Sequence, residues 1–330
     1  MTKREEQIKD LLQKNNLLCA PTEKITSDAS NRKYLRLTKG NKTVILMDSN
    51  PEENEPVNNF IYFTNFLRKH HFSAPKIYDS DIPNGLLLLE DLGARNFADI
   101  LKVKPKVETN IYKEAVNQLI MIQSKDTPKQ AKPYSTEILV EEALLFTEWY
   151  LGEANSSRLS NQFTSLLTPL LKKINKTKPT LVLRDFHAEN LIWINSRKNF
   201  KRVGLLDYQD ALIGHPAYDI ASLLKDARRD VSIEVRDIMT NHYLEKTKHN
   251  KDLFLRDYSI LSAQRNLKII GIFSRLSIRD KKYNYIKLIP RVWKNLENDF
   301  IHPDLENLSK FINSVAPYPN VNILKNLYQE

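Results

Sequence analysis

Cysteine, long hydrophobic runs and leader-like features are scarce in this sequence, and each shortage excludes a class of protein. Only one cysteine is present, Cys19, so an intramolecular disulfide is impossible. No stretch approaches the roughly 20 consecutive apolar residues that a membrane-spanning helix needs. The charged first residues, Met1 to Glu6, are followed by no apolar region typical of a secretory signal. We therefore expect a cytoplasmic protein with no membrane partner.

The composition is that of an ordinary globular protein. The chain has 330 residues, of which 41% are hydrophobic and 27% charged. This length suffices for one large domain or for two lobes with a sizeable core. We find no internal repeat and no low-complexity segment, so repeat and disordered architectures are not indicated.

The formal net charge of +10 has several possible meanings: a nucleic-acid partner, an anionic surface or an anionic small ligand. Lysine and arginine are scattered along the chain, without the interleaved aromatics that single-strand binders use. No nucleic-acid-binding motif is present. We therefore favour a solvated, lysine-rich surface and expect no nucleic-acid partner, while an anionic small ligand remains compatible with the charge.

Three polar side chains stand out because short apolar runs surround them. The runs are Thr180–Leu183, Leu191–Ile194 and Val203–Leu206. Such runs are typical of buried strands, although periodicity alone cannot exclude helix. Asp185 and Asn190 lie in the polar loop between the first two runs, and Asp207 follows the third. A strand, turn and strand after the loop would bring Asn190 and Asp207 side by side.

This layout suits phosphoryl transfer, in which a protein orients a hydroxyl and helps Mg²⁺ to neutralise a triphosphate. The D-x-x-x-x-N pattern with a later strand-terminal Asp matches a kinase catalytic loop and its metal-binding Asp. Asp185 would then accept the proton of the hydroxyl, while Asn190 and Asp207 offer the hard oxygen ligands that Mg²⁺ prefers. The alternative is an Asp and an Asn in ordinary polar turns, which the strand context and the second Asp disfavour.

The stretch from Asp207 to Ala221 resembles the signature of the aminoglycoside phosphotransferase family. That signature has an Asp, a short loop, G-D-P and a D-[LI]-A that opens a helix; here His215 replaces the Asp of G-D-P. The resemblance implies an α+β, bilobal, protein-kinase-like fold that binds ATP between its lobes. It places a small, β-rich nucleotide-binding lobe at residues 1–92 and a larger helical, acceptor-binding lobe at residues 93–330.

Within this family the chain is most similar to bacterial kinases of the anomeric hydroxyl of N-acetylmuramate and N-acetylglucosamine. The likeness extends from about residue 5 to about residue 300 and is carried by four segments: Asp28–Tyr34, Leu87–Gly93, the catalytic stretch and Gln264–Leu276. It implies a small-molecule kinase of peptidoglycan recycling that transfers the γ-phosphate of ATP to a sugar hydroxyl. We expect a monomer with ATP and Mg²⁺ as cofactors.

The same resemblance identifies Ser27 to Arg32 as the loop that covers the phosphates. Such loops are normally glycine-rich, yet no glycine precedes Gly40. We expect Ser30 and Arg32 to contact phosphate oxygens, since Arg is suited to bidentate phosphate contact. The alternative is a plain polar turn.

Residues 24–48 predict a β-hairpin with its turn at residues 39–41, and a lysine expected on its second strand is missing. Kinases use it to contact the α- and β-phosphates, but here its position holds Met47 or Asp48. Either another cation, Arg32 or Lys33, replaces it, or ATP binds weakly. An alternative is that Asp48, at the strand end, faces the cleft. At the expected hinge, backbone groups of Leu89 to Leu92, including those of Glu90 and Leu92, would pair with adenine.

Further residues are expected to support the loop or bind the acceptor. Asp219 would accept hydrogen bonds from the loop backbone or cap its own helix, and His187 would brace the loop or, less favoured, shuttle a proton. Gln264, Arg265 and Lys268 lie on one predicted helix, where Gln264 and Lys268 share a face. They would bind sugar hydroxyls, the N-acetyl group or a carboxylate, unless that face is simply solvated. Asp210 and Asp226 are further candidates for the sugar hydroxyls.

Three alternative functions stay open. An aminoglycoside or amino-alcohol acceptor would want an acidic pocket, which the Arg and Lys residues of the 264–275 segment disfavour. A pseudokinase-like binder is favoured by the missing lysine and the glycine-free loop, and opposed by the intact Asp185, Asn190 and Asp207. A nucleic-acid binder rests on the net charge alone.

The remaining periodicity predicts the elements that carry these residues. Helices are expected at 3–14, 51–70, 111–122, 137–151, 159–174, 216–227, 231–244, 253–278 and 283–296. Strands are expected at 34–37, 44–47, 74–78 and 86–89, besides the three apolar runs.

Overall fold

The computed structural model describes residues 2–25, 31–152, 156–174 and 177–327. It divides into two compact units: Met1–Ile100 with Glu189–Asp210, and Leu101–Ala188 with Ala211–Glu330. The first unit contains the larger sheet and the second is mostly helical, which confirms the predicted α+β class. The segment Glu189–Asp210 belongs to the first unit. The sequence analysis assigned it to the C-terminal lobe, residues 93–330. The lobe boundary drawn there for nucleotide and acceptor binding stays a prediction.

The first unit is built around a five-stranded antiparallel sheet in the order β1-β2-β3-β5-β4. The strands are β1 (Thr22–Ile25), β2 (Lys33–Lys39), β3 (Lys42–Asp48), β4 (Ile77–Asp81) and β5 (Leu86–Glu90). The predicted hairpin is confirmed as β2 and β3, and its turn residue Gly40 has a φ of +59°, a conformation that glycine adopts without strain. Strand β1 has no clear hydrophobic alternation and was not predicted.

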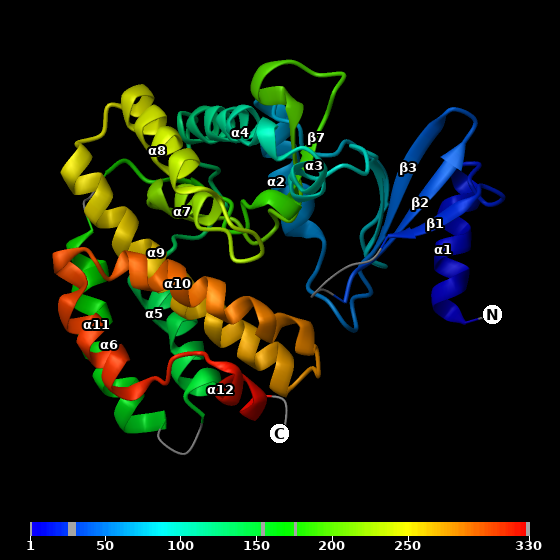
Figure 1. The fold of residues 1–330 in the computed structure, drawn as a ribbon. Helices are drawn as coiled ribbons and strands as arrows, with labels where there is room; N and C mark the ends of the chain where they lie inside the picture. The colour runs from blue at the N-terminus through cyan, green and yellow to red at the C-terminus, as the bar shows by residue number, and fades with distance from the viewer. Residues whose placement is uncertain (1, 26–30, 153–155, 175–176, 328–330) are drawn as a thin grey trace. The chain divides into compact units, whose positions relative to one another are not determined.

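Helix α1 (Lys3–Lys14) covers one face of this sheet (Figure 1). The apolar residues between helix and sheet form one core cluster: Leu11, Leu12, Leu17, Leu37, Leu46, Leu86 and Leu88. Because strand residues alternate between faces, Asp48 points to the same side as Leu46. There its carboxylate pairs with the guanidinium of Arg4 on α1. The alternative in which Asp48 faces the cleft is therefore wrong, because Asp48 faces α1, and Met47 occupies the opposite face.

Helix α2 (Asn58–Lys69) begins later than predicted. The backbone amides of Glu53 and Asn54 both donate to the carbonyl of Asn50, at 3.0 and 2.9 Å, which closes a turn where the sequence indicated the first helical turn. Pro51, Glu52 and Glu53, which open the expected helix 51–70, therefore belong to a separate turn. The buried face of α2 contains Phe60, Phe63, Thr64 and Leu67.

Two short strands carry the predicted metal residues within the first unit. Strands β7 (Leu191–Trp193) and β8 (Val203–Leu205) pair antiparallel, with Leu191 opposite Leu205. The backbone amide of Leu206 donates to the carbonyl of Asn190 at 3.0 Å. These strands confirm the predicted strand, turn and strand arrangement. A Cβ on Gly204 would lie 3.0 Å from Leu92 Cδ1, so a glycine suits this close contact.

The second unit is organised around α9, a helix buried along most of its length. Figure 1 shows α5 and α10 running beside α9. The helices with bounds within this unit are α4 (Glu108–Gln123), α5 (Thr136–Leu145), α6 (Ser156–Lys173), α7 (Ala217–Leu224), α8 (Ile233–Thr247), α9 (Lys251–Ile278), α10 (Ile289–Asp299), α11 (Glu306–Val315) and α12 (Val321–Asn326). The short helix α3 (Phe97–Val103) spans the boundary between the units, and β6 (Thr180–Val182) pairs with β9 (Leu212–Gly214).

The predicted helix 137–151 changes type part of the way along. Its α-helical part ends at Leu145, and Phe146–Tyr150 forms a π-helical turn. Helix α9 passes very close to this point, because a Cβ on Gly271 would lie 2.2 Å from the carbonyl carbon of Leu145. Hydrophobic periodicity contains no signal for such a backbone contact, so the sequence predicted one continuous helix.

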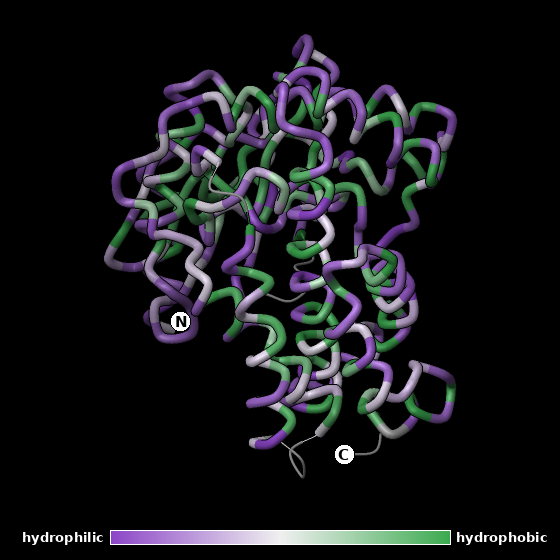
Figure 2. Tube along the Cα trace, turned by 90° about the vertical axis from the view of Figure 1, so that its left-hand side faces the viewer, coloured by the Kyte–Doolittle hydropathy of each residue, from purple (hydrophilic) through white to green (hydrophobic). Residues whose placement is uncertain are grey.

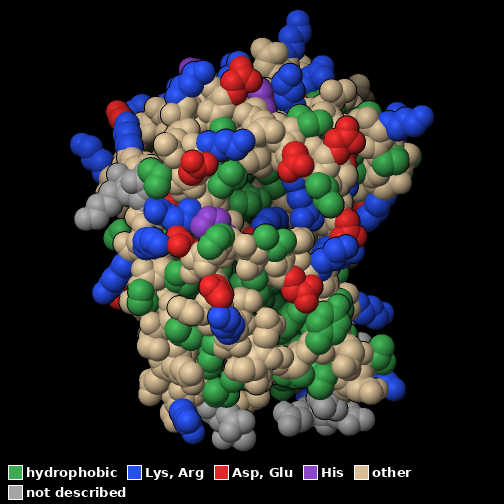
Figure 3. Space-filling model, turned by 60° about the vertical axis from the view of Figure 1, so that its left-hand side comes forward, with side chains coloured by type: hydrophobic (Ala, Val, Ile, Leu, Met, Phe, Trp, Pro, Cys, Tyr) green, Lys and Arg blue, Asp and Glu red, His purple; other side chains and the backbone are tan. Residues whose placement is uncertain are grey.

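Hydrophobic and hydrophilic residues alternate at short intervals along the helical segments (Figure 2). Within the described ranges, no helix combines the length and apolarity that crossing a bilayer requires. On the face drawn in Figure 3, Lys and Arg side chains are scattered and interspersed with Asp and Glu. This distribution agrees with the expectation that the net positive charge is dispersed.

Candidate active site

The loop that carries Asp185 is fixed at its start by a buried carboxylate of the second unit. Asp219, in the first turn of α7, accepts hydrogen bonds from the backbone amides of Leu183 at 2.7 Å and Arg184 at 2.9 Å. Burial raises the pKa of Asp219 to about 7, although these two hydrogen bonds favour the ionised form. The carboxylate thus makes the contacts expected of a loop brace, and its importance for activity stays a prediction.

Asp226 fixes the other end of the same loop. It is 1% exposed and accepts from the backbone amides of Ala188 at 3.1 Å and Arg228 at 2.8 Å. A carboxylate that is buried and engaged by backbone amides is poorly placed for a sugar hydroxyl. The geometry of Asp226 is therefore that of a second loop brace, and its expected contact with a sugar hydroxyl stays a prediction.

Asp185 itself lies in the chain between the residues that these braces hold, and it is an exposed residue. The protein around it raises its pKa by desolvation, but nearby positive groups outweigh this effect and hold the pKa below its usual value. Lys268 contributes most, followed by His187 and Arg265. Asp185 is therefore ionised at neutral pH and able to accept a hydrogen bond or a proton from a hydroxyl.

His187 is buried, with 4% of its surface exposed. Burial lowers its pKa to about 4, and the nearby guanidinium of Arg228 acts in the same direction. The Nε2 atom lies 3.4 Å from Nη1 of Arg228, and the backbone amide donates to the carbonyl of Asp185 at 3.1 Å. A histidine that is neutral at physiological pH and buried in the loop fits the bracing role better than that of a proton shuttle.

The three residues of α9 that were expected to bind the acceptor are largely shielded from solvent. Gln264 is fully buried and donates to the carbonyl of Leu139 on α5 at 2.8 Å. Arg265 is 4% exposed, and Lys268 Nζ lies 2.9 Å from Glu142 Oε2. The alternative of a solvated helix face is therefore wrong. Burial also leaves Gln264 and Arg265 poorly placed to touch a ligand directly, whereas Lys268 stays a candidate.

The predicted metal residues are adjacent in the first unit. Asn190 Nδ2 lies 3.4 Å from Asp207 Oδ2, and Asp207 has a φ of +57°, which is uncommon for a residue with a side chain. Gln209 Nε2 donates both to Asp207 Oδ1 at 2.9 Å and to Asp210 Oδ2 at 3.1 Å. The amide of Gln209 thus fixes the orientation of Asp207, and it leaves Asp210 exposed as a candidate sugar contact.

The donor set fits a magnesium ion shared with a nucleotide. Among the described residues, no group of three or more His, Cys, Asp or Glu side chains is suited to hold a metal alone. Mg²⁺ usually takes one or two protein ligands together with waters and phosphate oxygens. Asn190 and Asp207 supply such a pair, and the exposed Asp207 can be reached by a ligand.

Tyr34 and Arg32 lie on the side of the sheet that faces Asp207. Tyr34 is the register partner of Met47. Burial raises the pKa of Tyr34 to about 12, and the negative charge of Asp207 acts in the same direction. Arg32, which donates a hydrogen bond to the Tyr34 hydroxyl, lowers the pKa in part. Arg32 and Asp207 thus both act on Tyr34, whereas Lys33 is exposed. The predicted partner in the phosphate loop, Ser30, lies outside the described residues.

The expected hinge residues are tied into the first unit through side-chain contacts. Glu90 accepts from Arg68 Nη1 at 3.2 Å and from Arg197 Nη2 at 2.6 Å. Leu92 forms a small core cluster with Ile192 and Ile194. The side chain of Glu90 therefore has a structural role, and adenine binding by backbone groups of this segment stays a prediction.

Two contributors escaped the sequence analysis. Glu142 on α5 pairs with both Arg184 and Lys268, and Thr64 on α2 shares a hydrogen bond with Tyr208. Each is a single polar residue on an otherwise unremarkable helix, and its partner is distant in sequence. One sequence without aligned relatives contains no signal that would single them out.

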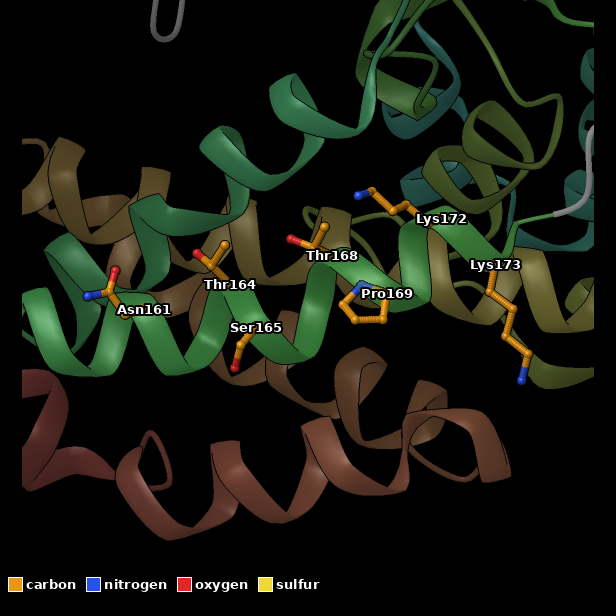
Figure 4. Close-up of a pocket in the computed structure, with 7 residues that line it drawn as sticks. All are labelled: Asn161, Thr164, Ser165, Thr168, Pro169, Lys172 and Lys173. Atoms are coloured by element: carbon orange, nitrogen blue, oxygen red, sulfur yellow. The ribbon is translucent and has the colours of Figure 1, made fainter.

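A shallow hollow of about 710 Å³ lies along α6, far in sequence from these residues. It is lined by Asn161, Thr164, Ser165, Thr168, Pro169, Lys172 and Lys173. Figure 4 shows that all seven come from this one helix and that their side chains point apart. They do not converge on a common centre, and none is an acid or a histidine that could take part in proton transfer.

Comparison with known proteins identifies the family. Residues 22–258 match the phosphotransferase enzyme family. The N-acetylmuramate/N-acetylglucosamine kinase of Caulobacter vibrioides is 31% identical over 334 residues, covering 89% of this chain and 92% of that protein. Among solved structures, the choline kinase LicA from Streptococcus pneumoniae has a TM-score of 0.64 at 17% identity, covering 90% of this chain and all of that one. The ADP-bound aminoglycoside phosphotransferase APH(2'')-Ib has a TM-score of 0.63 at 14% identity, covering 90% and 99%. The chain therefore belongs to the phosphotransferase enzyme family, as the resemblance in its sequence predicted.

Proposed function

We propose that this protein is an ATP-dependent sugar kinase that phosphorylates the anomeric hydroxyl of N-acetylmuramate or N-acetylglucosamine. The observation that carries the proposal is the exposed residue Asp185, ionised at neutral pH, in a loop held at both ends by buried acids. The relative from Caulobacter vibrioides, which matches nearly the whole chain, bears the name of such a kinase. We further propose that the protein acts in the cytoplasm as a monomer, on amino sugars released from peptidoglycan.

Asp185 has the properties required of the group that activates the acceptor. Its lowered pKa keeps it ionised at neutral pH, so it accepts the hydrogen bond of the acceptor hydroxyl and then its proton. An anomeric hydroxyl is more acidic than an ordinary alcohol, so a weakly basic carboxylate that mainly orients the oxygen suffices. The oxygen attacks the γ-phosphorus, the bond from phosphorus to the bridging oxygen breaks, and ADP leaves.

Asn190 and Asp207 would hold Mg²⁺ in this scheme. When bound, the ion neutralises charge on the triphosphate. The contribution of the chain is the fixed geometry of the pair: β7 and β8 place Asn190 beside Asp207, and Gln209 orients the carboxylate. This preorganisation removes the need to order the ligands during each turnover.

Arg32 is our candidate for the cation that replaces the absent strand lysine. The sheet face near Asp207 presents Tyr34 and Met47 instead of a lysine. Arg32 is half-buried and hydrogen-bonded to Tyr34, which orients its guanidinium, and guanidinium groups bind phosphate in bidentate fashion. The absent lysine is therefore compatible with catalysis, which weakens the pseudokinase alternative.

The charges near Asp185 favour a neutral or anionic acceptor. Lys268, Arg265 and Arg184 all act on Asp185 as positive groups. A cationic amino alcohol or aminoglycoside would be repelled by such an environment. The choline kinase and the aminoglycoside phosphotransferase are both less than 20% identical to this chain. Their similarity therefore supports the fold and is no argument for a cationic acceptor.

An acceptor panel tests the proposal. Purified protein is incubated with ATP, MgCl₂ and either N-acetylmuramate, N-acetylglucosamine, choline or kanamycin, and ADP release is measured. We expect turnover with one or both acetylated sugars and none with the cationic acceptors. Turnover with choline or kanamycin alone would overturn the acceptor assignment, and no turnover with any acceptor would favour a binding protein.

A further inference from the structure

Arg184, the residue directly before Asp185, has a left-handed backbone conformation with a φ of +70°. For a residue with a side chain this conformation is disfavoured, because the Cβ atom lies too close to the backbone carbonyl oxygen. Such residues persist only where the surrounding structure determines their conformation, and they cluster at functional sites. The contacts that hold Arg184 are therefore also contacts that direct the side chain of Asp185.

The backbone of Arg184 is held on both sides by α7. Its amide donates to Asp219 at 2.9 Å, and its carbonyl accepts from the hydroxyl of Ser222 at 3.2 Å. Both partners are fully buried. These contacts fix the position of the peptide groups. The side chain of Arg184 adds further contacts, with α5 and with Tyr134.

The side chain of Arg184 is held by Glu142 on α5. The guanidinium forms an ion pair with Glu142 Oε1, and it lies over the ring of Tyr134 at 5.5 Å from the ring centroid. The Arg184 and Glu142 side chains are 19% and 15% exposed. An ion pair this well shielded is sensitive to the loss of one partner, because the remaining charge is then poorly solvated.

Glu142 engages two further groups. Its Oε2 atom lies 2.9 Å from Lys268 Nζ and also accepts from the hydroxyl of Tyr134. Lys268 and Arg184 both act on Asp185 as positive groups. The carboxylate of Glu142 thus holds two cations, Arg184 and Lys268, that act on the proposed base Asp185. Arg184 is also the residue that precedes Asp185 in the chain.

We infer that Glu142 is a positioning residue: it holds Arg184 in the left-handed conformation and Lys268 beside it, and so aims Asp185 at the acceptor hydroxyl. The inference rests on the proposed function of Asp185. It assigns Glu142 no contact with the acceptor or the nucleotide. The effect of Glu142 is therefore expected in kcat, with little change in the KM for ATP.

The experiment compares Glu142→Ala, Glu142→Gln and the neighbouring exposed glutamate as Glu141→Ala. Glu142→Ala is expected to lower kcat on the order of 100-fold, as misplacement of a reacting group by about 1 Å does. Glu142→Gln keeps the shape and an acceptor oxygen and is expected to lower kcat about tenfold. Glu141→Ala is expected to stay within about twofold of the parent, as substitutions on an exposed surface usually do.

A second substitution separates positioning from general damage. Glycine adopts a φ of +70° without strain, so Arg184→Gly removes the need for the ion pair. In the Glu142→Ala background, Arg184→Gly is expected to restore kcat at least tenfold. A kcat in the double variant equal to the product of the two single losses would overturn the inference. If Glu142→Ala does not fold, as judged by circular dichroism, a parent-like kcat of Glu142→Gln would overturn it instead.

Asp185→Asn is measured in parallel. If Asp185→Asn is as active as the parent, the proposed base is wrong and the role of Glu142 falls with it. If Asp185→Asn is inactive while Glu142→Ala keeps the parent kcat, the proposed function stands and the inference about Glu142 alone is wrong.

Discussion

The hydroxyl of Thr64 on α2 lies 2.7 Å from the hydroxyl of Tyr208, the residue that follows Asp207. Both residues are buried, with 0% and 1% exposure, and the ring of Tyr208 stacks on Phe60 at a centroid distance of 5.4 Å. The pair joins α2 to the backbone that presents Asp207 in its left-handed conformation. We conclude that the orientation of the proposed metal ligand depends on a helix more than one hundred residues earlier in the chain.

Removing either hydroxyl should destabilise the protein. Tyr208→Phe or Thr64→Val leaves the other hydroxyl buried without this partner, which costs about 1–3 kcal/mol in the free energy of unfolding. The double variant should lose less than the sum of the single losses, because it leaves no hydroxyl of the pair unsatisfied. Urea unfolding of the four proteins measures this coupling. Strictly additive losses would show that the two hydroxyls act independently.

Asp207→Asn should weaken the response to magnesium. Replacing a carboxylate by an amide removes one negative charge from the proposed ligand pair, so the Mg²⁺ concentration for half-maximal activity should rise at least about tenfold. Calorimetry provides a readout independent of turnover: Mg²⁺ should strengthen ADP binding by the parent and have little effect on the variant. An equal gain in both proteins would contradict the assignment of Asp207.

Acidification should destabilise the protein through His187. Its folded pKa is about 4, below the roughly 6.5 of an unfolded histidine. Between these values the unfolded state binds more protons, so the free energy of unfolding falls as the pH drops from about 6.5 towards 4, by about 2 kcal/mol at pH 5. His187→Gln should lack this loss, and other groups that titrate there, including Asp219, cancel in the comparison. If the parent and His187→Gln lose the same free energy of unfolding between pH 7.5 and pH 5, this explanation is wrong.

Arg32→Met should raise the KM for ATP about tenfold, which corresponds to losing roughly 1.4 kcal/mol of binding. The KM for the sugar should stay within about twofold, because Arg32 belongs to the unit that contains the proposed metal residues. Lys33→Met is the matched control, since Lys33 is the exposed neighbour. A larger effect of Lys33→Met would show that the other candidate replaces the strand lysine.

The sequence predicted the strands and loops of the catalytic stretch well because they depend on local patterns. The apolar runs around Asp185, Asn190 and Asp207 form β6, β7 and β8, and Asp219 makes the predicted backbone contacts. These features follow from short-range periodicity and from a motif with fixed spacing.

What the sequence could not predict depends on tertiary packing. Whether a polar helical face is solvated depends on neighbouring helices, so the sequence left open whether Gln264 is solvated, and its contact with α5 shows that it is buried. Asp226 offered the same chemistry as a sugar ligand, and only its burial revealed the bracing role. Helix α2 was predicted too long because the turn closed on the carbonyl of Asn50 is not continued into the helix, which begins only at Asn58.

Phosphorus NMR of the product tests the central claim most directly. The protein is incubated with ATP, MgCl₂ and N-acetylmuramate or N-acetylglucosamine, and the product phosphorus is examined for coupling to the anomeric proton. We predict a sugar 1-phosphate, formed by the parent and strongly reduced in Asp185→Asn by on the order of 10²- to 10⁴-fold. Phosphate on another carbon, or equal product from parent and variant, would contradict the account.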